Sequence, residues 1–285
     1  TISSTGTSFG RVVEFGGTSA FDSLTTCIIN APVVANTSAN FAAVYAFSFK
    51  GNDIVVKGNT INNGSTGIYF SGFSTAIRTS RIAIDSNTIN GSYQYGIYNN
   101  FTEAIKLNNN TVNVSAPTFS SSYGIYTTAA DSLYQVTNNK VRIANTVGTQ
   151  YGIYINASTG TATNRGKLLN NDVVAGTGNT SNIYGLYVTA SPFIDVFNNT
   201  VAVNTSGASS FGIYCNNSAN GNYYNNSVNS IATSATNNFA AYFLNTSATS
   251  IIAINNIFSH KAGGRAMYIG NSSNISSNYN MLYTT

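Results

Sequence analysis

Charged side chains are scarce in this sequence. Only 7% of its 285 residues are Asp, Glu, Lys or Arg, against about 25% in an ordinary soluble domain. The 12 basic residues outnumber the 8 acidic ones and give a formal charge of +4, but they are scattered and form no dense run. Because nucleic-acid binding normally requires a basic stripe that neutralises several phosphates, we expect no nucleic-acid partner.

Cysteine, histidine and long apolar runs are also scarce. Cys27 and Cys215 are the only cysteines, and His260 is the only histidine. Two cysteines cannot build a disulfide framework and one histidine cannot build a His-based metal site, so we predict no metal and no other cofactor. No apolar stretch approaches the roughly 18–20 residues of a membrane-spanning helix, so we expect no membrane insertion. Scarce cysteine fits an extracellular protein that is stabilised by other means.

Internal repetition dominates what is present. An Asn-x-(Ile/Val) element alternates with a Gly-(Ile/Leu)-Tyr element at a period of about 28 residues, which is typical of a solenoid. The asparagines of the first element, with their degenerate copies, are Asn59, Asn87, Asn110, Asn139, Asn171, Asn199, Asn226, Asn256 and Asn280. The tyrosines of the second element, with their degenerate copies, are Tyr69, Tyr98, Tyr126, Tyr154, Tyr187, Tyr214, Tyr242 and Tyr268.

Apolar and polar residues alternate on both sides of the repeat asparagines. Ile54 and Val56 stand before Asn59, and Ile82 and Ile84 stand at the same offsets before Asn87. Period-two alternation over short runs, separated by polar turns, indicates strands and excludes helical repeats. If such units stack in parallel, their inward apolar residues form continuous columns, with adjacent coils about 4.8 Å apart.

In these repeats the chain resembles the right-handed parallel β-helix repeat family, the pectate-lyase-like solenoids, whose coils carry a similar asparagine turn and Gly-Ile strand. The resemblance covers residues 20–283 and implies an all-β right-handed parallel β-helix of about nine to ten coils, roughly 28 residues each. This fold hosts lyases, hydrolases, tailspikes and adhesins, so it does not identify a function. The Asn/Ser/Thr-rich style also resembles large secreted proteins of type IX-secreting Bacteroidetes-type bacteria, which implies an extracellular or cell-surface location.

The repeat asparagines are expected to form a structural ladder. Asparagine tolerates a left-handed turn, and its amide can donate to one neighbouring coil while accepting from the other. A buried asparagine without those partners would cost about 1–3 kcal/mol, so a ladder would also fix the register between coils.

The repeat tyrosines admit two interpretations. If Ile97 points inward, strict alternation sends Gly96 and Tyr98 outward and Tyr95 inward, and it places the eight repeat tyrosines in one outward file. The file is either a structural stack that covers the glycines or a ligand-binding surface for glycans or another partner.

The acidic residues suggest no active site. Counted from the repeat asparagine of their own coils, Asp53, Asp85, Glu103, Asp131 and Asp195 all stand at different offsets. No two carboxylates are therefore predicted within the roughly 5–9.5 Å that a glycosidase requires. We predict no catalytic residues and no enzymatic activity.

Two serines are candidate modification sites. Ser23 and Ser132 stand in the triplets Asp22-Ser23-Leu24 and Asp131-Ser132-Leu133. Both triplets resemble the short O-glycosylation acceptor of Bacteroidetes-type bacteria.

We expect residues 1–285 to form a single β-helix domain, because no linker or composition break appears. Neither end carries an amphipathic cap helix, so we expect a segment of a longer polypeptide, with end-to-end contacts to further repeats. The leading hypothesis is a non-catalytic structural or adhesive segment of a large secreted or cell-surface protein. Its expected partners are glycans, other surface proteins or secretion machinery. The alternatives are a carbohydrate-binding module that uses the tyrosine file, and a degenerate polysaccharide lyase or hydrolase.

Overall fold

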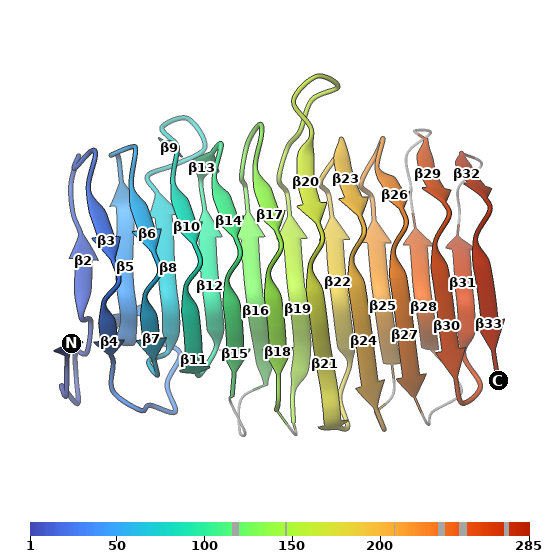
Figure 1. The fold of residues 1–285 in the computed structure, drawn as a ribbon, viewed down its shortest axis with the longest axis horizontal. Coiled ribbons are helices and arrows are strands. Elements are labelled where there is room, and N and C mark those ends of the chain that lie inside the picture. The colour runs from blue at the N-terminus through green and yellow to red at the C-terminus, as the bar shows by residue number, and fades with distance from the viewer. Residues whose placement is uncertain (116–119, 146, 208, 233–236, 245–249, 271–273) are drawn as a thin grey trace.

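The strands of the chain wind into a solenoid with its two termini at opposite ends (Figure 1). The computed structural model describes residues 1–115, 120–145, 147–207, 209–232, 237–244, 250–270 and 274–285. Within these ranges the only helix is a short 3-10 turn, η1 (Ala39–Phe41), and the remaining regular structure is β. Successive coils each add one strand to three parallel sheets.

Sheet 1 precedes the repeat asparagines. It contains β3 (Ser23–Thr25), β6 (Val55–Lys57), β10 (Ala83–Asp85), β14 (Lys106–Asn108), β17 (Gln135–Thr137), β20 (Gly166–Leu169), β23 (Ile194–Phe197), β26 (Asn222–Tyr224), β29 (Ile251–Ile254) and β32 (Ile275–Asn278).

Sheet 2 follows the repeat asparagines. It contains β1 (Ile2–Ser3), β4 (Ile28–Asn30), β7 (Thr60–Asn62), β11 (Thr88–Ser92), β15 (Thr111–Val114), β18 (Lys140–Ile143), β21 (Asp172–Asn179), β24 (Thr200–Thr205), β27 (Ser227–Ala232), β30 (Ile257–Lys261) and β33 (Met281–Thr284).

Sheet 3 carries the repeat tyrosines. It contains β2 (Val13–Phe15), β5 (Ala42–Phe49), β8 (Thr66–Gly72), β12 (Tyr95–Asn100), β16 (Ser121–Thr128), β19 (Thr149–Asn156), β22 (Ile183–Thr189), β25 (Ser209–Asn216), β28 (Asn237–Leu244) and β31 (Arg265–Gly270). A small fourth pair, β9 (Thr79–Ser80) and β13 (Thr102–Glu103), lies in the segments that join sheet 3 to sheet 1.

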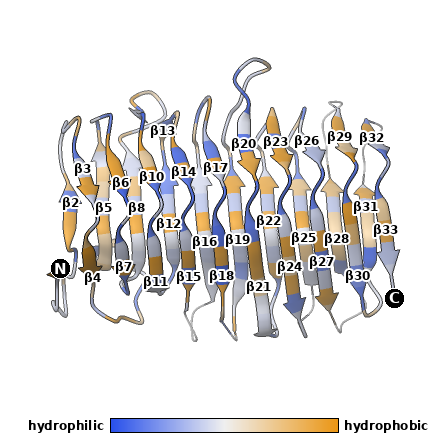
Figure 2. Cartoon of the chain, in the orientation of Figure 1, coloured by the Kyte–Doolittle hydropathy of each residue, from blue (hydrophilic) through white to orange (hydrophobic). Residues whose placement is uncertain are grey.

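The predicted all-β parallel β-helix is confirmed. Equivalent ladder asparagines are 23 to 32 residues apart, which brackets the predicted period of about 28. The core is built from inward columns in strict register, such as Val56, Ile84 and Leu107 in sheet 1, all fully buried. Apolar and polar segments alternate along the strands of all three sheets (Figure 2).

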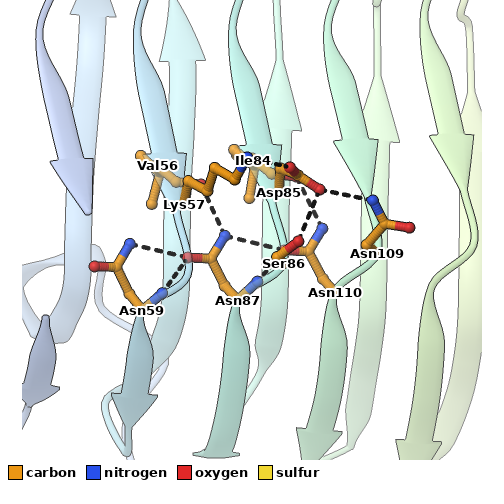
Figure 3. Close-up of polar contacts among 9 residues, drawn as sticks. All are labelled: Val56, Lys57, Asn59, Ile84, Asp85, Ser86, Asn87, Asn109 and Asn110. Carbon is orange, nitrogen blue, oxygen red and sulfur yellow. Dashed lines mark hydrogen bonds and ion pairs between the residues drawn. The ribbon is translucent and has the colours of Figure 1, made fainter. Parts of the chain in front are cut away.

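Each interior repeat asparagine uses its whole amide to join its neighbouring coils. Asn87 Nδ2 donates to Val56 O at 2.8 Å and to Asn110 Oδ1 at 3.0 Å (Figure 3). Its Oδ1 accepts from the backbone N–H and from Nδ2 of Asn59, at 3.0 and 2.9 Å. Both amide hydrogens and both acceptor positions of Asn87 are occupied. This residue is only 1% exposed, yet none of its side-chain polar atoms lacks a hydrogen-bond partner.

The same contacts recur along one column of the solenoid. All nine repeat asparagines lie in it: Asn59, Asn87, Asn110, Asn139, Asn171, Asn199, Asn226, Asn256 and Asn280. At the N-terminal end Cys27 occupies the equivalent position, and its backbone N–H donates to Asn59 Oδ1 at 2.9 Å. At the other end Asn280 Nδ2 donates to Ser277 Oγ instead of to a further asparagine.

The left-handed turn falls one residue earlier than expected. The residues with φ near +57° are those directly before the ladder asparagines, such as Ser86, Asn109 and Asn138. The expectation that the ladder asparagine itself occupies the left-handed conformation is therefore wrong. The preceding residue makes the turn and is exposed to solvent. The side chain of the ladder asparagine can therefore point inward and bond to the asparagines of the neighbouring coils.

Replacement of Asn139 by Leu tests the energetic role of this column. The change removes the partners of the Asn110 N–H, of one Asn110 Nδ2 hydrogen and of the Leu107 carbonyl. Each orphaned buried polar group costs about 1–3 kcal/mol, so we expect the free energy of unfolding to fall by about 3 kcal/mol or more in denaturant titrations. Asn138→Gly, at the exposed left-handed neighbour, is the matched control and should change stability by less than about 1 kcal/mol. A fully stable Asn139→Leu protein would contradict this assignment.

Candidate functional site

The repeat tyrosines lie in one file on the outer surface of sheet 3. Each tyrosine is the register partner of the next, and Tyr45 extends the file at its N-terminal end. Successive ring centroids are 4.5–5.6 Å apart, from Tyr69 through Tyr268. Seven of the eight repeat tyrosines are half-buried, and the eighth, Tyr268, is 36% exposed.

A second aromatic file runs beside the first. It contains Tyr95, Tyr123, Tyr151, Tyr184, Phe211 and Phe239, with centroids 4.7–5.5 Å apart. Tyr95 also contacts Tyr98 at 5.2 Å, so both rings lie on the same outer side of the sheet. The expectation that Tyr95 points inward is wrong. The recurring Tyr-Gly-Ile-Tyr sequence was the signal for this second file.

The orientation differs because alternation breaks at the Gly-Ile pair. A Cβ on Gly96 would lie 2.1 Å from Val112 Cγ1 and 2.6 Å from the Gly124 carbonyl oxygen, so this position faces the core. Ile97 is also fully buried. Two successive inward residues reverse the phase of the strand, which sends the aromatic residues on both sides of the pair outward. The first inward position is glycine in β8, β12, β16, β19, β22 and β25 and alanine in β5, β28 and β31, so it holds only the two smallest residues.

The faces of these rings are covered by other rings. Tyr123 and Tyr151 are 4.7 Å apart with planes 4° apart, and most of the other successive pairs are similarly stacked. The Arg11 guanidinium lies 3.5 Å from the Tyr45 ring centroid at one end, and Arg265 lies 5.5 Å from Phe239 at the other. Stacking of a sugar on an aromatic ring requires a free face, whereas this strip presents ring edges and hydroxyl groups.

Burial of the strip makes the fold sensitive to alkaline pH. Burial, with smaller effects of neighbouring tyrosines, raises the pKa of Tyr214 from 10.0 to about 12. A raised phenol pKa contributes stability that is fully present below pH 10.0 and is lost as the pH rises through the folded value. We expect the free energy of unfolding to fall between about pH 10 and 12, with a shallower fall in Tyr214→Phe, in denaturant titrations at each pH. An equal pH dependence of the unfolding free energy in the parent and in Tyr214→Phe would contradict the raised pKa of Tyr214.

Charged residues concentrate at sheet 1 and the segments that lead into it. These parts carry six of the eight acidic residues: Asp22, Asp53, Asp85, Glu103, Asp131 and Asp195. Glu103 and Asp131 are direct register partners in adjacent coils, about 4.8 Å apart in the backbone. These two residues lie in different coils, as predicted, but they are direct backbone neighbours on one edge, which their unequal offsets did not predict.

Basic side chains pair with four of these six carboxylates, three through arginines and Asp85 through Lys57. Arg81 binds Asp53 through two hydrogen bonds of 2.6 and 2.7 Å, and this contact lowers the pKa of Asp53. Arg78 Nε lies 3.5 Å from Asp131 Oδ2, so its side chain spans the coil of Glu103. Both arginines are thereby oriented along the same edge of the solenoid.

A cavity of about 390 Å³ opens beside this edge, over three adjacent coils. Ala83 and Ala104 line it with short side chains, which occupy less space than those of the longer neighbours. Its other lining side chains include Arg81, Lys106, Leu133 and Gln135. Ala83, Lys106 and Gln135 are register partners in β10, β14 and β17, and each stands four residues before its ladder asparagine. That constant offset from the ladder asparagine is the sequence signal for this outward file.

The remaining predicted positions do not join this cavity. Ser23 is exposed in β3, whereas Ser132 is half-buried and its N–H donates to Asp131 Oδ1 at 2.9 Å.

Within the described residues, no group of three or more His, Cys, Asp or Glu side chains is placed to hold a metal ion. In the same part of the chain, no helix is long and apolar enough to cross a membrane.

The sequence matches no known protein-family model and no curated protein. Its fold is similar to the periplasmic alginate epimerase AlgG, with a TM-score of 0.53 and 13% identity over 92% of this chain and 67% of that one. The D317A mutant of AlgG gives a TM-score of 0.51 at 12% identity, over 96% and 77% of the two chains. The Azotobacter vinelandii mannuronan C-5 epimerase AlgE6 A-module gives 0.42 at 11% identity, over 94% and 80%.

These likenesses correct one expectation. The prediction that the chain is not an enzyme is contradicted, because the solved structures that share its solenoid include alginate epimerases. Glu103 and Asp131 are also backbone neighbours on one edge, whereas their unequal offsets predicted separate positions. At this level of identity the likeness establishes the fold that these proteins share with the chain.

Proposed function

We propose that this chain is a secreted or cell-surface β-helix that binds a polysaccharide in the cavity over β10, β14 and β17. The observation that carries the proposal is the cavity itself, whose volume of about 390 Å³ falls in the range of small-molecule sites. It is formed where the charged residues of an otherwise charge-poor chain concentrate.

The lining of the cavity suits a sugar unit, which presents hydroxyl groups and apolar C–H surfaces together. Lys106 and Arg81 supply hydrogen-bond donors, and the Gln135 amide both donates and accepts. Ala83 and Leu133 supply apolar contact. Arg81 is already oriented by Asp53, so its three remaining N–H donors are held in place before a ligand arrives.

The fold likeness to AlgG supports polysaccharide as the class of ligand, because AlgG is an alginate epimerase. The tyrosine strip, which was the other candidate surface, supports binding less well. Its ring faces contact one another, and arginines lie over Tyr45 and Phe239.

Affinity electrophoresis against alginate, polygalacturonate, pectin, dextran and xylan tests the proposal. We expect at least one polymer to retard the protein. Ala83→Trp should fill the hollow and weaken that retardation at least about tenfold, since steric exclusion removes the apolar contacts and the sugar's access to Lys106.

Ala202→Trp is the matched control, because Ala202 is also a half-buried outward alanine but lies on β24 of sheet 2. It should bind as the parent does. The proposal fails if no polymer retards the protein, or if both tryptophan variants bind equally well.

A further inference from the structure

Beyond the cavity, the outer surface of sheet 1 continues as a polar file. Lys106, Gln135 and Lys167 are successive register partners in β14, β17 and β20. Parallel strands lie about 4.8 Å apart, so the two lysines are separated by about 10 Å along the solenoid axis. A glycan that leaves the cavity along this axis passes over both.

Most cations of this face are neutralised within the protein. Lys57 pairs with Asp85 at 3.5 Å, Arg81 with Asp53 at 2.6 Å, and Arg165 with Asp195 at 2.6 Å. These contacts leave little attraction for an external anion, because each positive charge already has a carboxylate beside it.

Lys106 and Lys167 are different. Neither forms an ion pair among the residues that the structure describes. Asp195, the register partner of Lys167, is held by Arg165 and accepts a hydrogen bond of 2.8 Å from Asn222. The file therefore presents two uncompensated positive charges on a chain in which only 7% of residues are charged.

Apolar side chains border the file on the same face. Leu169, Phe197 and Tyr224 are half-buried register partners in β20, β23 and β26, and the two rings stack at 4.8 Å. A polymer over Lys167 therefore meets charge on one side and apolar surface on the other, which matches the two kinds of surface of a sugar chain.

We infer that the site selects an anionic polysaccharide, which runs along the solenoid axis with acidic groups against Lys106 and Lys167. The inference rests on the proposed function and adds the chemistry of the ligand and its direction. Carboxylate and sulfate groups share the charge that the lysines recognise, so the test includes both. Glu103 lies at the entry edge of sheet 1 and opposes an anion there, which places the acidic groups over the strands rather than over the edge.

The experiment compares polymers that differ only in charge. The probes are polygalacturonate with its fully methyl-esterified form, and dextran sulfate with dextran, measured by calorimetry at low and high salt. We expect one acidic polymer to bind at least about fivefold more tightly than its neutral form at low salt, with the difference reduced at high salt by screening. Whichever acidic polymer shows this preference identifies carboxylate or sulfate as the recognised group.

The variants assign the effect to the two lysines. Lys106→Gln and Lys167→Gln should each weaken binding of the acidic polymer about two- to fivefold, and the double variant should bind acidic and neutral forms alike. Lys140→Gln, on sheet 2, is the matched control and should bind as the parent does. Glu103→Gln should strengthen binding, because it removes the opposing charge. Circular dichroism verifies that each variant is folded.

Two outcomes overturn the inference in different ways. Equal binding of acidic and neutral forms by the parent would overturn the charge selectivity and leave polysaccharide binding intact. No binding to any probe would overturn both this inference and the proposed function.

Discussion

The saturated asparagine ladder is the constraint on which the rest of this solenoid depends. The side-chain amide of an interior ladder asparagine donates two hydrogen bonds to adjacent coils and accepts two from them. A coil that slips by one residue therefore leaves several buried polar groups without partners. Loops elsewhere in the coil vary in length, but the ladder resets the register once per turn. Every outward file, aromatic or charged, inherits its alignment from this column.

Register explains why sheet 3 carries continuous aromatic files whereas sheet 1 carries a cavity. On sheet 3 the same two positions are aromatic in coil after coil, so the rings stack on each other, and Arg11 and Arg265 lie over Tyr45 and Phe239. On sheet 1 the outward position varies among alanine, lysine, glutamine and aspartate. Because side-chain size varies between neighbouring coils, short alanines lie beside the hydrogen-bond donors Lys106 and Gln135 and leave a hollow there. A file of identical side chains would leave no such hollow.

The period and the inward columns could be predicted from sequence, because the Asn-x-Ile element and the alternation of residues such as Val56 and Ile84 depend on local geometry. The orientation of Tyr95 could not, since alternation fails where Gly96 and Ile97 both face the core. A shared edge for Asp53, Glu103 and Asp131 could be predicted, but the exact register of Glu103 with Asp131 was hidden by loop length. Glu103 stands seven residues before its ladder asparagine and Asp131 stands eight. The extra residue is absorbed where both Ser132 and Leu133 take positive φ, whereas the earlier coil has only Ala104 there.

A crystal structure of the protein with a bound acidic oligosaccharide tests the central claim most directly. The account predicts sugar density in the hollow formed by Ala83 and Ala104, with the chain running across β14, β17 and β20 and acidic groups near Lys106 and Lys167. Sugar density confined to the tyrosine strip of sheet 3, with the hollow over β10, β14 and β17 empty, would contradict it.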